Sequence, residues 1–223
     1  MHYAMNSAER NYWQRFYRSF QENTPTSFAI FVHHFLQDPQ NASDKNRVWR
    51  LLDIGCGNGR DSYYFAEQQK YIVSGMDVSH TPQPKDGCHF FLSDMTQFDG
   101  YDGYDILYAR FTFHSITDAQ QEMLLAHIQR PDILLCIETR STKGWDTNCV
   151  HGNNSHFRNL TDADRLKNIL DKHGFEMLYF EEKDGIARYK NEDPVCIRVI
   201  CKKRKRFSLD TLISQPGPFR KSI

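Results

Sequence analysis

The sequence predicts an α/β fold, with a doubly wound, mostly parallel sheet of seven strands and an N-terminal helical cap. Two observations support this prediction. From residue 48 onward, short apolar runs alternate with segments of helical spacing, the pattern typical of strands joined by crossover helices. The first run leads into DIGCGNG (53–59), a glycine-rich turn of the kind that joins a strand to a helix.

Two helices are expected before the sheet. In the first, Asn6 and Glu9 form a capping box. Five aromatic residues share one face of that helix: Tyr12, Trp13, Phe16, Tyr17 and Phe20. The second helix begins at Thr24-Pro25 and is stopped by Pro39, with apolar residues at helical spacing between them.

Seven strands are expected from the apolar runs, at 48–54, 71–77, 89–93, 105–109, 133–138, 175–182 and 195–202. The run at 133–138 is almost continuously apolar, which is typical of a central parallel strand that is covered on both faces. Further helices are expected at 58–69, from a capping box at Thr117 to about residue 129, and from a cap at Thr161 to the His173-Gly174 stop. Pro82 and Pro84 predict a loop, not a helix, between the second and third strands.

These elements divide the chain into three parts. We assign residues 1–47 to the helical cap, including a polar linker at 40–47. Residues 48–202 form the main domain, and residues 203–223 form a basic C-terminal tail.

Composition limits the classes of function. Lys and Arg together number 28, as do Asp and Glu, so the net charge gives no reason to expect nucleic acid as a partner. No apolar stretch approaches the roughly 20 residues that span a bilayer, and the N-terminus does not have the pattern of a secretory signal. Six cysteines without a CxxC pair indicate free thiols in a reducing compartment. We therefore expect a soluble cytoplasmic protein, and no metal-binding motif is present.

The glycine turn indicates a ligand at the carboxyl ends of the strands. A dinucleotide-binding fingerprint needs a third glycine where Arg60 stands, which weakens the interpretation as a dehydrogenase. Asp77 ends the second strand, about 18 residues after Gly59, where a carboxylate can accept both hydroxyls of a ribose. Asp94 ends the third strand and is placed to bind an adenine amino group.

With these residues the sequence resembles the class I S-adenosylmethionine-dependent methyltransferases, from residue 48 to about residue 202. The resemblance implies a Rossmann-like fold, S-adenosyl-L-methionine as cofactor and methyl transfer as the activity. It implies that Asp53 lies near the methionine portion of the cofactor, that Asp77 holds the ribose and that Asp94 binds adenine. The residues expected to bind the cofactor are Tyr12, Trp13, Asp53, Gly55, Cys56, Gly57, Asn58, Gly59, Asp77, Val78, Asp94, Met95 and Tyr108.

Shorter motifs suggest a finer resemblance. The run GCGNGR (55–60) is similar to small-molecule and tellurite-type methyltransferases. The runs YWQRFY (12–17), YARFTFHSI (108–116) and IETRS (137–141) resemble methyltransferase modules of bacterial polysaccharide modification. Some of these modules methylate sugars or terminal phosphates.

The methyl acceptor is expected at the rim that follows the fourth and fifth strands. His114 either deprotonates a hydroxyl or binds an anion, and Arg110 matches the geometry of phosphate or carboxylate, so these two are the expected catalytic residues. A histidine with a structural hydrogen bond and ordinary surface ion pairs are the alternative interpretations. The polar stretch at 141–160 is the expected lid. The residues expected to bind the acceptor are Tyr17, Arg110, His114, Glu138, Arg140, Lys143 and His156.

We therefore expect O-methylation of a small or glycan-linked anionic acceptor, such as a phosphate or a sugar acid. Two alternatives remain open. One is a nucleic-acid or protein methyltransferase that docks through the basic run KKRKR (202–206). The other is a non-catalytic subunit that only binds S-adenosylmethionine.

Overall fold

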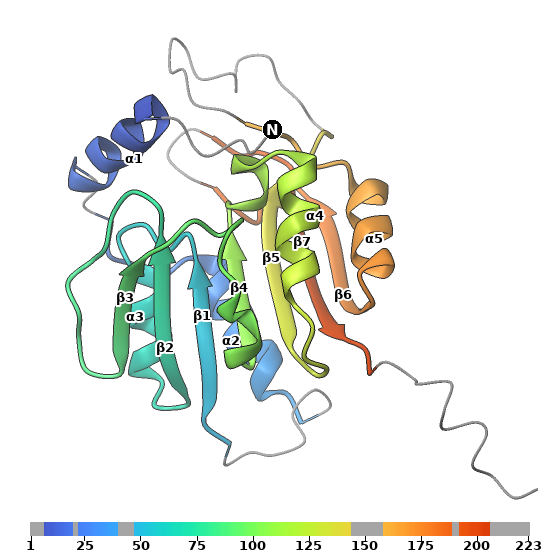
Figure 1. Cartoon of the computed structure of the whole chain (residues 1–223), viewed down its shortest axis with the longest axis horizontal. Coiled ribbons are helices and arrows are strands. Elements are labelled where there is room, and N and C mark those ends of the chain that lie inside the picture. The colour runs from blue at the N-terminus through green and yellow to red at the C-terminus, as the bar shows by residue number, and fades with distance from the viewer. Residues whose placement is uncertain (1–6, 20–21, 40–46, 144–157, 189–191, 206–223) are drawn as a thin grey trace, which may run out of the picture.

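Seven strands form one sheet in the order β3-β2-β1-β4-β5-β7-β6 (Figure 1). The strands are β1 (Trp49–Ile54), β2 (Tyr71–Asp77), β3 (Cys88–Leu92), β4 (Ile106–Arg110), β5 (Leu134–Arg140), β6 (Phe175–Lys183) and β7 (Cys196–Lys203). Strands β1 to β5 pair in parallel, and β7 is antiparallel to both β5 and β6. The predicted doubly wound, mostly parallel sheet is confirmed, and its order reverses between β1 and β4.

The computed structural model describes residues 7–19, 22–39, 47–143, 158–188 and 192–205. Asn6, Phe20 and His156 lie outside the described residues. So do most of the linker at 40–47, most of the expected lid at 141–160 and nearly all of the tail at 203–223. The division of the chain into three parts therefore stays a prediction.

Helices cover both faces of the sheet (Figure 1). They are α1 (Ser7–Ser19), α2 (Ser27–Gln37), α3 (Arg60–Glu67), α4 (Asp118–His127) and α5 (Ala163–Lys172), with short 3-10 helices η1 (Gly100–Gly103) and η2 (Phe113–Ser115). Helices α4 and α5 lie on one face, and α2 and α3 lie on the other. Helix α1 lies apart from both layers, above the carboxyl ends of the strands.

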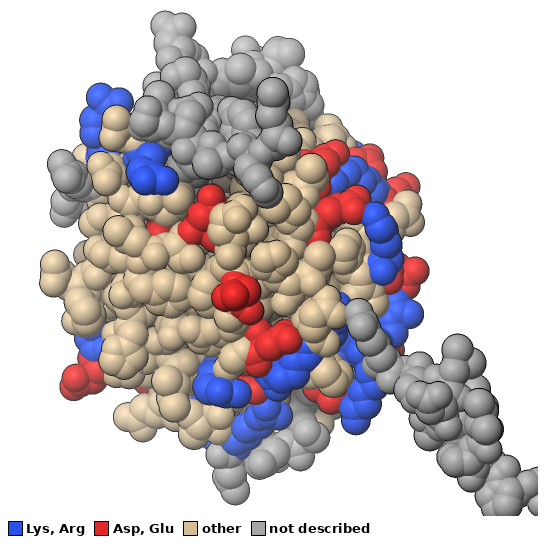
Figure 2. Space-filling view, viewed as in Figure 1, with Lys and Arg blue, Asp and Glu red and all other residues tan. Residues whose placement is uncertain are grey.

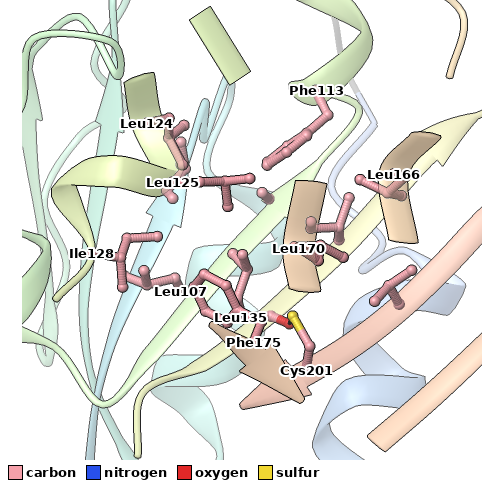
Figure 3. Packing of buried hydrophobic residues seen from close by; sticks show 14 of the residues in the cluster. Leu107, Phe113, Leu124, Leu125, Ile128, Leu135, Leu166, Leu170, Phe175 and Cys201 are labelled. Carbon is pink, nitrogen blue, oxygen red and sulfur yellow. Dashed lines mark hydrogen bonds between the residues drawn. The ribbon is translucent and has the colours of Figure 1, made fainter. Parts of the chain in front are cut away.

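Each face of the sheet has its own apolar core. Residues of β5 alternate between the two, because successive side chains of a strand point to opposite faces. Leu135 and Ile137 pack with α4 and α5, the core shown in Figure 3, whereas Leu134 and Cys136 pack with α2 and α3. All seven residues of β5 are buried. This explains the nearly continuous apolar run that the sequence shows at 133–138.

Two helix starts differ from the prediction. Helix α2 begins at Ser27, because the hydroxyl of its cap Thr26 accepts the N–H of Ala29 at 3.2 Å. The predicted start at Thr24-Pro25 was thus two residues too early. Helix α5 is capped by Asp162, which accepts the N–H of Arg165 at 2.8 Å. Thr161 does not cap it.

Other local predictions are confirmed. Thr117 and Gln120 form the capping box of α4. Gly174 has a φ of +75° directly after α5, as expected of a helix stop. Residues 78–87, all of them described, contain no helix between β2 and β3. The five described cysteines are all buried and free. In the described part of the chain, no helix is long and apolar enough to cross a bilayer.

Truncating a leucine in the core tests this packing. Leu107 is fully buried beneath α4, and Leu92 is 64% exposed on the edge strand β3. We expect Leu107→Ala to lower the free energy of unfolding by about 2–5 kcal/mol, because it leaves a cavity. The control Leu92→Ala should change it by about 0.5 kcal/mol or less. Urea unfolding followed by circular dichroism measures both, and equal losses would contradict the assigned core.

Candidate functional site

A cavity of about 740 Å³ lies at the carboxyl ends of the strands, where the order of the sheet reverses. Its wall is formed by the glycine turn after β1, by α1 and by the segments that follow β4 and β5. In open α/β sheets, ligands bind in the crevice at this point of the topology. The cavity therefore occupies the place that the sequence predicts for a ligand.

The glycine turn leaves room for neighbouring side chains and for a ligand. Gly55 and Gly57 have φ angles of +73° and +55°, in the left-handed region that side chains disfavour. A Cβ atom on Gly55 would lie 2.2 Å from Cγ2 of Thr112. A Cβ atom on Gly57 would lie 2.4 Å from the ring of Tyr17. Both positions thus require glycine in this turn, which we call the cradle. Gly55 lines the cavity, whereas Gly57 lies beneath the ring of Tyr17.

Two carboxylates stand beside this cradle. Asp77 accepts the N–H of Gly57 at 3.2 Å with one oxygen and the N–H and hydroxyl of Ser79 with the other, at 2.8 and 2.7 Å. Asp53 accepts the hydroxyl of Ser62 at 2.5 Å. Both carboxylates line the cavity. Asp77 is thus fixed at the end of β2, where the sequence predicts a ribose-binding group.

Burial of Asp53 raises the pKa of its carboxyl group to about 8, and the negative charge of Asp61 adds to this effect. The carboxyl group is therefore mostly protonated at neutral pH in the free protein. A cation bound nearby would favour its ionised form. The site is suited to the positively charged methionine end of the cofactor that the resemblance implies.

The aromatic face of α1 closes over the cradle. Tyr12, Trp13 and Tyr17 all line the cavity, as the sequence predicts. The ring of Tyr17 is the one that touches Gly57, and it stacks on Trp13 with 5.9 Å between ring centroids. Tyr17, predicted at the acceptor, thus lies against the turn that is expected to hold the cofactor.

Some of the residues that are expected to bind adenine line the cavity, and one does not. Val78 and Met95 line the cavity, together with Ser93. Asp94 is not among the lining residues, because its carboxylate turns back to accept the N–H and the hydroxyl of Thr96 at 2.9 and 2.8 Å. Its role at adenine stays a prediction.

Tyr108 lines the cavity, and its hydroxyl is held by a carboxylate that the sequence did not lead us to expect, that of Asp61. Its hydroxyl donates to Asp61 at 2.7 Å, and the hydroxyl of Thr26 donates to the same carboxylate oxygen at 2.8 Å. The N–H of Thr26 donates to the other oxygen at 2.8 Å. Asp61 thus joins α2, α3 and β4 at the base of the cavity. The position of Asp61 in the sequence could have indicated this role, because it is an acidic residue in the first turn of the helix that follows the glycines.

Arginine is frequent among the residues that line the cavity. Five described arginines line the cavity, at positions 60, 110, 140, 158 and 188. Arg110 donates through Nε to Glu138 at 2.9 Å, and Arg198 donates through Nε to the other oxygen of Glu138 at 2.7 Å. Glu138 is fully buried beneath these two cations, so it supports the cavity wall from behind. Arg198 was missed, although a single arginine in the apolar run CIRVIC (196–201) signals a buried partner.

Phe111 links the arginines of this wall. Its φ of +57° is in the left-handed region, which costs a non-glycine residue about 1–3 kcal/mol. Its N–H donates to the carbonyl of Glu138 at 2.7 Å. Its ring centroid lies 4.2 Å from Cζ of Arg110 and 5.6 Å from Cζ of Arg140. The strained backbone thus holds an aromatic ring beside two guanidinium groups, an arrangement that no local sequence pattern indicates.

Arg140 and Thr112 present buried polar atoms that have no hydrogen-bond partner in the described part of the chain. These atoms are Nε of Arg140 and the hydroxyl oxygen of Thr112. Both residues line the cavity, and each is more than nine-tenths buried. Arg140 uses Nη2 to pair with Glu192 at 2.7 Å. Because unpaired buried polar groups are costly, the two atoms mark a place for a polar ligand.

Of the other residues predicted to bind the acceptor, one lies at the cavity, one does not, and one lies outside the described residues. His114 is buried at the cavity wall, with its ring 5.2 Å from that of Phe111 between centroids. Lys143 is not brought to the cavity, because it is exposed and pairs with Glu182 at 2.6 Å. His156 lies outside the described residues. The described residues include no group of three or more His, Cys, Asp and Glu side chains arranged to hold a metal ion.

Comparison with known proteins agrees with this geometry. A family model described as methyltransferase domain matches residues 20–179. No curated protein matches the sequence. Many solved structures have a similar fold.

Three examples among these solved structures are described as methyltransferases. The 1,6-didemethyltoxoflavin-N1-methyltransferase of Burkholderia thailandensis, solved with 1,6-didemethyltoxoflavin and S-adenosylhomocysteine, is 17% identical, with a TM-score of 0.63 over 91% of this chain and 93% of that chain. A S-adenosylmethionine-dependent methyltransferase of Methanosarcina mazei is 16% identical, with a TM-score of 0.61 over 79% and 98%. Another, of Anabaena variabilis, is 16% identical, with a TM-score of 0.63 over 90% and 96%. At these identities the likeness shows the fold.

The raised pKa of Asp53 predicts a pH-dependent affinity. Below about pH 8 the carboxyl group must lose a proton to pair with the ammonium group of S-adenosylhomocysteine, so affinity for this ligand should rise with pH, by at most about tenfold per unit, and level off above that pKa. Calorimetric titrations across this range measure the slope. In Asp53→Asn the slope should disappear. A flat profile in the unmodified protein would contradict the prediction.

A methyl group added at the cradle should block it. Gly57→Ala has to move the ring of Tyr17 and strain the backbone, so we expect affinity for S-adenosylhomocysteine to fall by about tenfold or more. Gly103→Ala is the matched control, because a Cβ atom there meets nothing within 4 Å. The same titration measures both variants. Unchanged affinity in a folded Gly57→Ala protein would remove this turn from the site.

Proposed function

The chain belongs to the methyltransferase domain family, and we propose on this premise that it methylates an anionic oxygen of a small or glycan-linked acceptor. The protein is a S-adenosylmethionine-dependent methyltransferase. Its residues fit that cofactor, since the glycine cradle gives a close approach and Asp77 stands where ribose hydroxyls are bound. When bound, the cofactor supplies an electrophilic methyl carbon on a positively charged sulfur.

The observation that carries the proposal is the pair of buried atoms without partners, Nε of Arg140 and the hydroxyl of Thr112. Both can donate a hydrogen bond, and Arg110 adds a second guanidinium group on the same wall. An oxygen anion satisfies such donors through charge-assisted bonds, which are stronger than neutral ones. The guanidinium groups of Arg110, Arg140 and Arg198 have only two carboxylate partners among the residues that the structure describes, those of Glu138 and Glu192. A neutral hydroxyl would therefore leave one positive charge without a counterpart.

Charge is distributed unevenly around the cavity, which supports the same conclusion. The carboxyl group of Asp53 lines the cavity beside the cradle, where the cationic end of the cofactor is expected. The guanidinium groups of Arg110 and Arg140 stand on the wall after β4 and β5. Arg140 is partly neutralised by Glu192, and Arg110 by Glu138. One side of the cavity is thus suited to a cation and the other to an anion.

The protein contributes mainly by positioning. Methyl transfer is an in-line displacement, so rate depends on holding the acceptor oxygen close to the methyl carbon and aligned with the bond that breaks. Glu138 fixes the direction of Arg110 from behind, and the strained turn at Phe111 fixes the ring between Arg110 and Arg140. This wall is thus set in advance and needs little rearrangement when the acceptor binds.

The neighbours and the motifs support a small or glycan-linked acceptor. The enzyme of Burkholderia thailandensis was solved with the small molecule 1,6-didemethyltoxoflavin. The motifs at 12–17, 108–116 and 137–141 resemble modules that modify bacterial polysaccharides, and the motif at 55–60 resembles small-molecule and tellurite-type enzymes. A sugar acid or a phosphosugar satisfies both resemblances.

Docking of a nucleic acid or a protein through the basic run has less support. Within the described part of that run, Lys202 pairs with Asp132 at 2.8 Å and Arg204 pairs with Asp171. On the face shown in Figure 2, acidic and basic side chains are mixed along the right and lower edges, acidic side chains also lie near the middle, and most of the remaining surface is uncharged. Nucleic-acid surfaces usually carry a stripe of one sign. The four described basic side chains of the run thus have two carboxylate partners in their own chain, those of Asp132 and Asp171, which balance half of their charge.

Arginine replacement tests the proposed acceptor. With S-adenosylmethionine and a panel of sugar acids, phosphosugars and their neutral parent sugars, we expect release of S-adenosylhomocysteine only with anionic members. Arg140→Met should lower that turnover by about 100-fold and leave affinity for S-adenosylhomocysteine nearly unchanged.

Arg165→Met is the control, because Arg165 pairs with Asp118 of α4 and does not line the cavity. Its turnover should match that of the unmodified protein. Turnover confined to neutral acceptors, or unaffected by Arg140→Met, would contradict the proposal.

A further inference from the structure

Glu192 brings a carboxylate to the wall that follows β4 and β5, which we call the acceptor wall. It pairs with Nη2 of Arg140 at 2.7 Å, and both residues line the cavity. Its side chain is 33% exposed, whereas that of Glu138 is fully buried and does not line the cavity. Glu138 therefore supports the arginines of the wall from behind, and Glu192 borders the space that an acceptor would fill.

The backbone beside Glu192 is anchored in the connection between β6 and β7. Asp193, the next residue, accepts the N–H of Gly185 at 2.7 Å. The carbonyl of Ile186 accepts a hydrogen bond from Nη2 of Arg198 at 2.8 Å. These bonds tie the described parts of this connection to each other and to β7. The charge of Glu192 is therefore held at the acceptor wall by the fold.

The charges of the acceptor wall balance one anion. Arg110, Arg140 and Arg198 carry three positive charges, and Glu138 and Glu192 carry two negative ones. One positive charge is left among these five side chains, and two would be left without Glu192. Removing an ion from water costs more as its charge increases, so a doubly charged group needs more compensation than a singly charged one. The wall as it stands compensates one negative charge.

Three other arginines that line the cavity, at positions 60, 158 and 188, attract anions in general. Arg188 is paired with Asp193 at 2.8 Å, and the negative charge of Asp61 acts on Arg60. Glu192 is the described carboxylate that both lines the cavity and pairs with an arginine of the acceptor wall. Its charge is therefore the one most directly opposed to a second negative charge on an acceptor.

We propose that Glu192 is a specificity-determining residue, which selects a singly charged carboxylate as the acceptor and disfavours a doubly charged phosphate monoester. The inference rests on the proposed function and narrows it. Phosphate monoesters carry close to two negative charges at neutral pH, and carboxylates carry one. Sulfate esters and phosphate diesters also carry one charge, but they are weaker nucleophiles. Inorganic phosphate is in part singly charged near neutral pH, so it can still bind at the acceptor wall.

The reaction balances with a carboxylate and needs no base. One carboxylate oxygen forms the new O–C bond to the methyl carbon while the C–S bond breaks, and the electron pair of that bond stays on sulfur. The negative charge of the carboxylate and the positive charge of the sulfur cancel, so the product is a neutral methyl ester. The ester no longer offers the arginines a negative charge, which favours its release. A methylated phosphate monoester would keep one negative charge.

Binding of three small anions to the full chain, saturated with S-adenosylhomocysteine, tests the inference. Acetate and methyl sulfate carry one charge, and methyl phosphate carries close to two at about pH 7.5. Methyl sulfate and methyl phosphate have nearly the same shape, so their comparison isolates the effect of charge. In calorimetric titrations at constant ionic strength, methyl phosphate should bind at least about threefold more weakly than methyl sulfate. Acetate should compete with methyl sulfate, because both bind at the same wall.

Removing the charge of Glu192 should change this preference. Glu192→Gln keeps the shape of the side chain and an oxygen that accepts from Arg140. Because the effect of one charge scales with the charge of the ligand, affinity should rise about threefold for methyl sulfate and about tenfold for methyl phosphate. A variant that merely disturbed the wall would lose affinity for both anions.

Two further variants serve as controls. Glu192→Asp keeps the charge and should keep the preference of the unmodified protein. Asp164→Asn removes the same charge from a side chain of α5 that is 88% exposed and does not line the cavity. Its affinities should match those of the unmodified protein.

The outcomes separate this inference from the proposed function. Equal or tighter binding of methyl phosphate in the unmodified protein would overturn the role of Glu192, and so would a ratio of the two affinities that stays the same in Glu192→Gln. Either result leaves the anionic acceptor in place. Failure of all three anions to bind at any accessible concentration would overturn the anionic acceptor, and with it the selection by Glu192.

Discussion

The close packing against the glycine turn is the constraint on which the rest of the site depends. Thr112 and Tyr17 approach the turn so closely that a single Cβ atom at Gly55 or Gly57 would collide with them. Through these contacts the turn after β1 touches the segment after β4 on one side and α1 on the other. The floor for the cofactor, the wall for the acceptor and the aromatic cap are therefore one packed unit. A substitution in the turn should therefore affect the binding of both the cofactor and the acceptor.

A buried charge cluster supports the acceptor wall. Glu138 is fully buried between Arg110 and Arg198, and burying such ions costs solvation energy that their attraction only partly returns. The cluster is better explained by geometry than by stability. It directs Arg110 along the wall, while the strained turn at Phe111 places an aromatic ring between Arg110 and Arg140. Both features act on the anion-binding groups and keep them in place before the acceptor arrives.

The fold was predictable because its signals are local. Apolar runs, glycines and the capping box at Thr117 each act within a few residues, and all appear in the structure where the sequence placed them. At each misplaced helix start, a second capping residue stands close to the predicted one: Thr26 after Thr24, and Asp162 after Thr161. Tertiary contacts decided between them: Thr26 is held by Asp61, and Thr161 bonds to Thr139.

The candidate site was predictable only in part. The residues of the turn, Asp77 and the arginines after β4 and β5 follow from their positions at strand ends. The pairing of Arg198 with Glu138 joins residues that are 60 positions apart, so no local pattern reveals it. The backbone strain at Phe111 and the orientation of the His114 ring depend on hydrogen bonds to β5. Such features arise only when the strands have assembled into the sheet, so local sequence patterns do not predict them.

A crystal structure with S-adenosylhomocysteine and inorganic phosphate tests the central claim most directly. The account predicts S-adenosylhomocysteine on the glycine turn, with its ribose hydroxyls at Asp77. It predicts a phosphate oxygen within hydrogen-bond distance of Nε of Arg140 and the hydroxyl of Thr112, the two buried donors without partners among the described residues. Phosphate bound elsewhere, with these two donors satisfied by the chain itself, would contradict it.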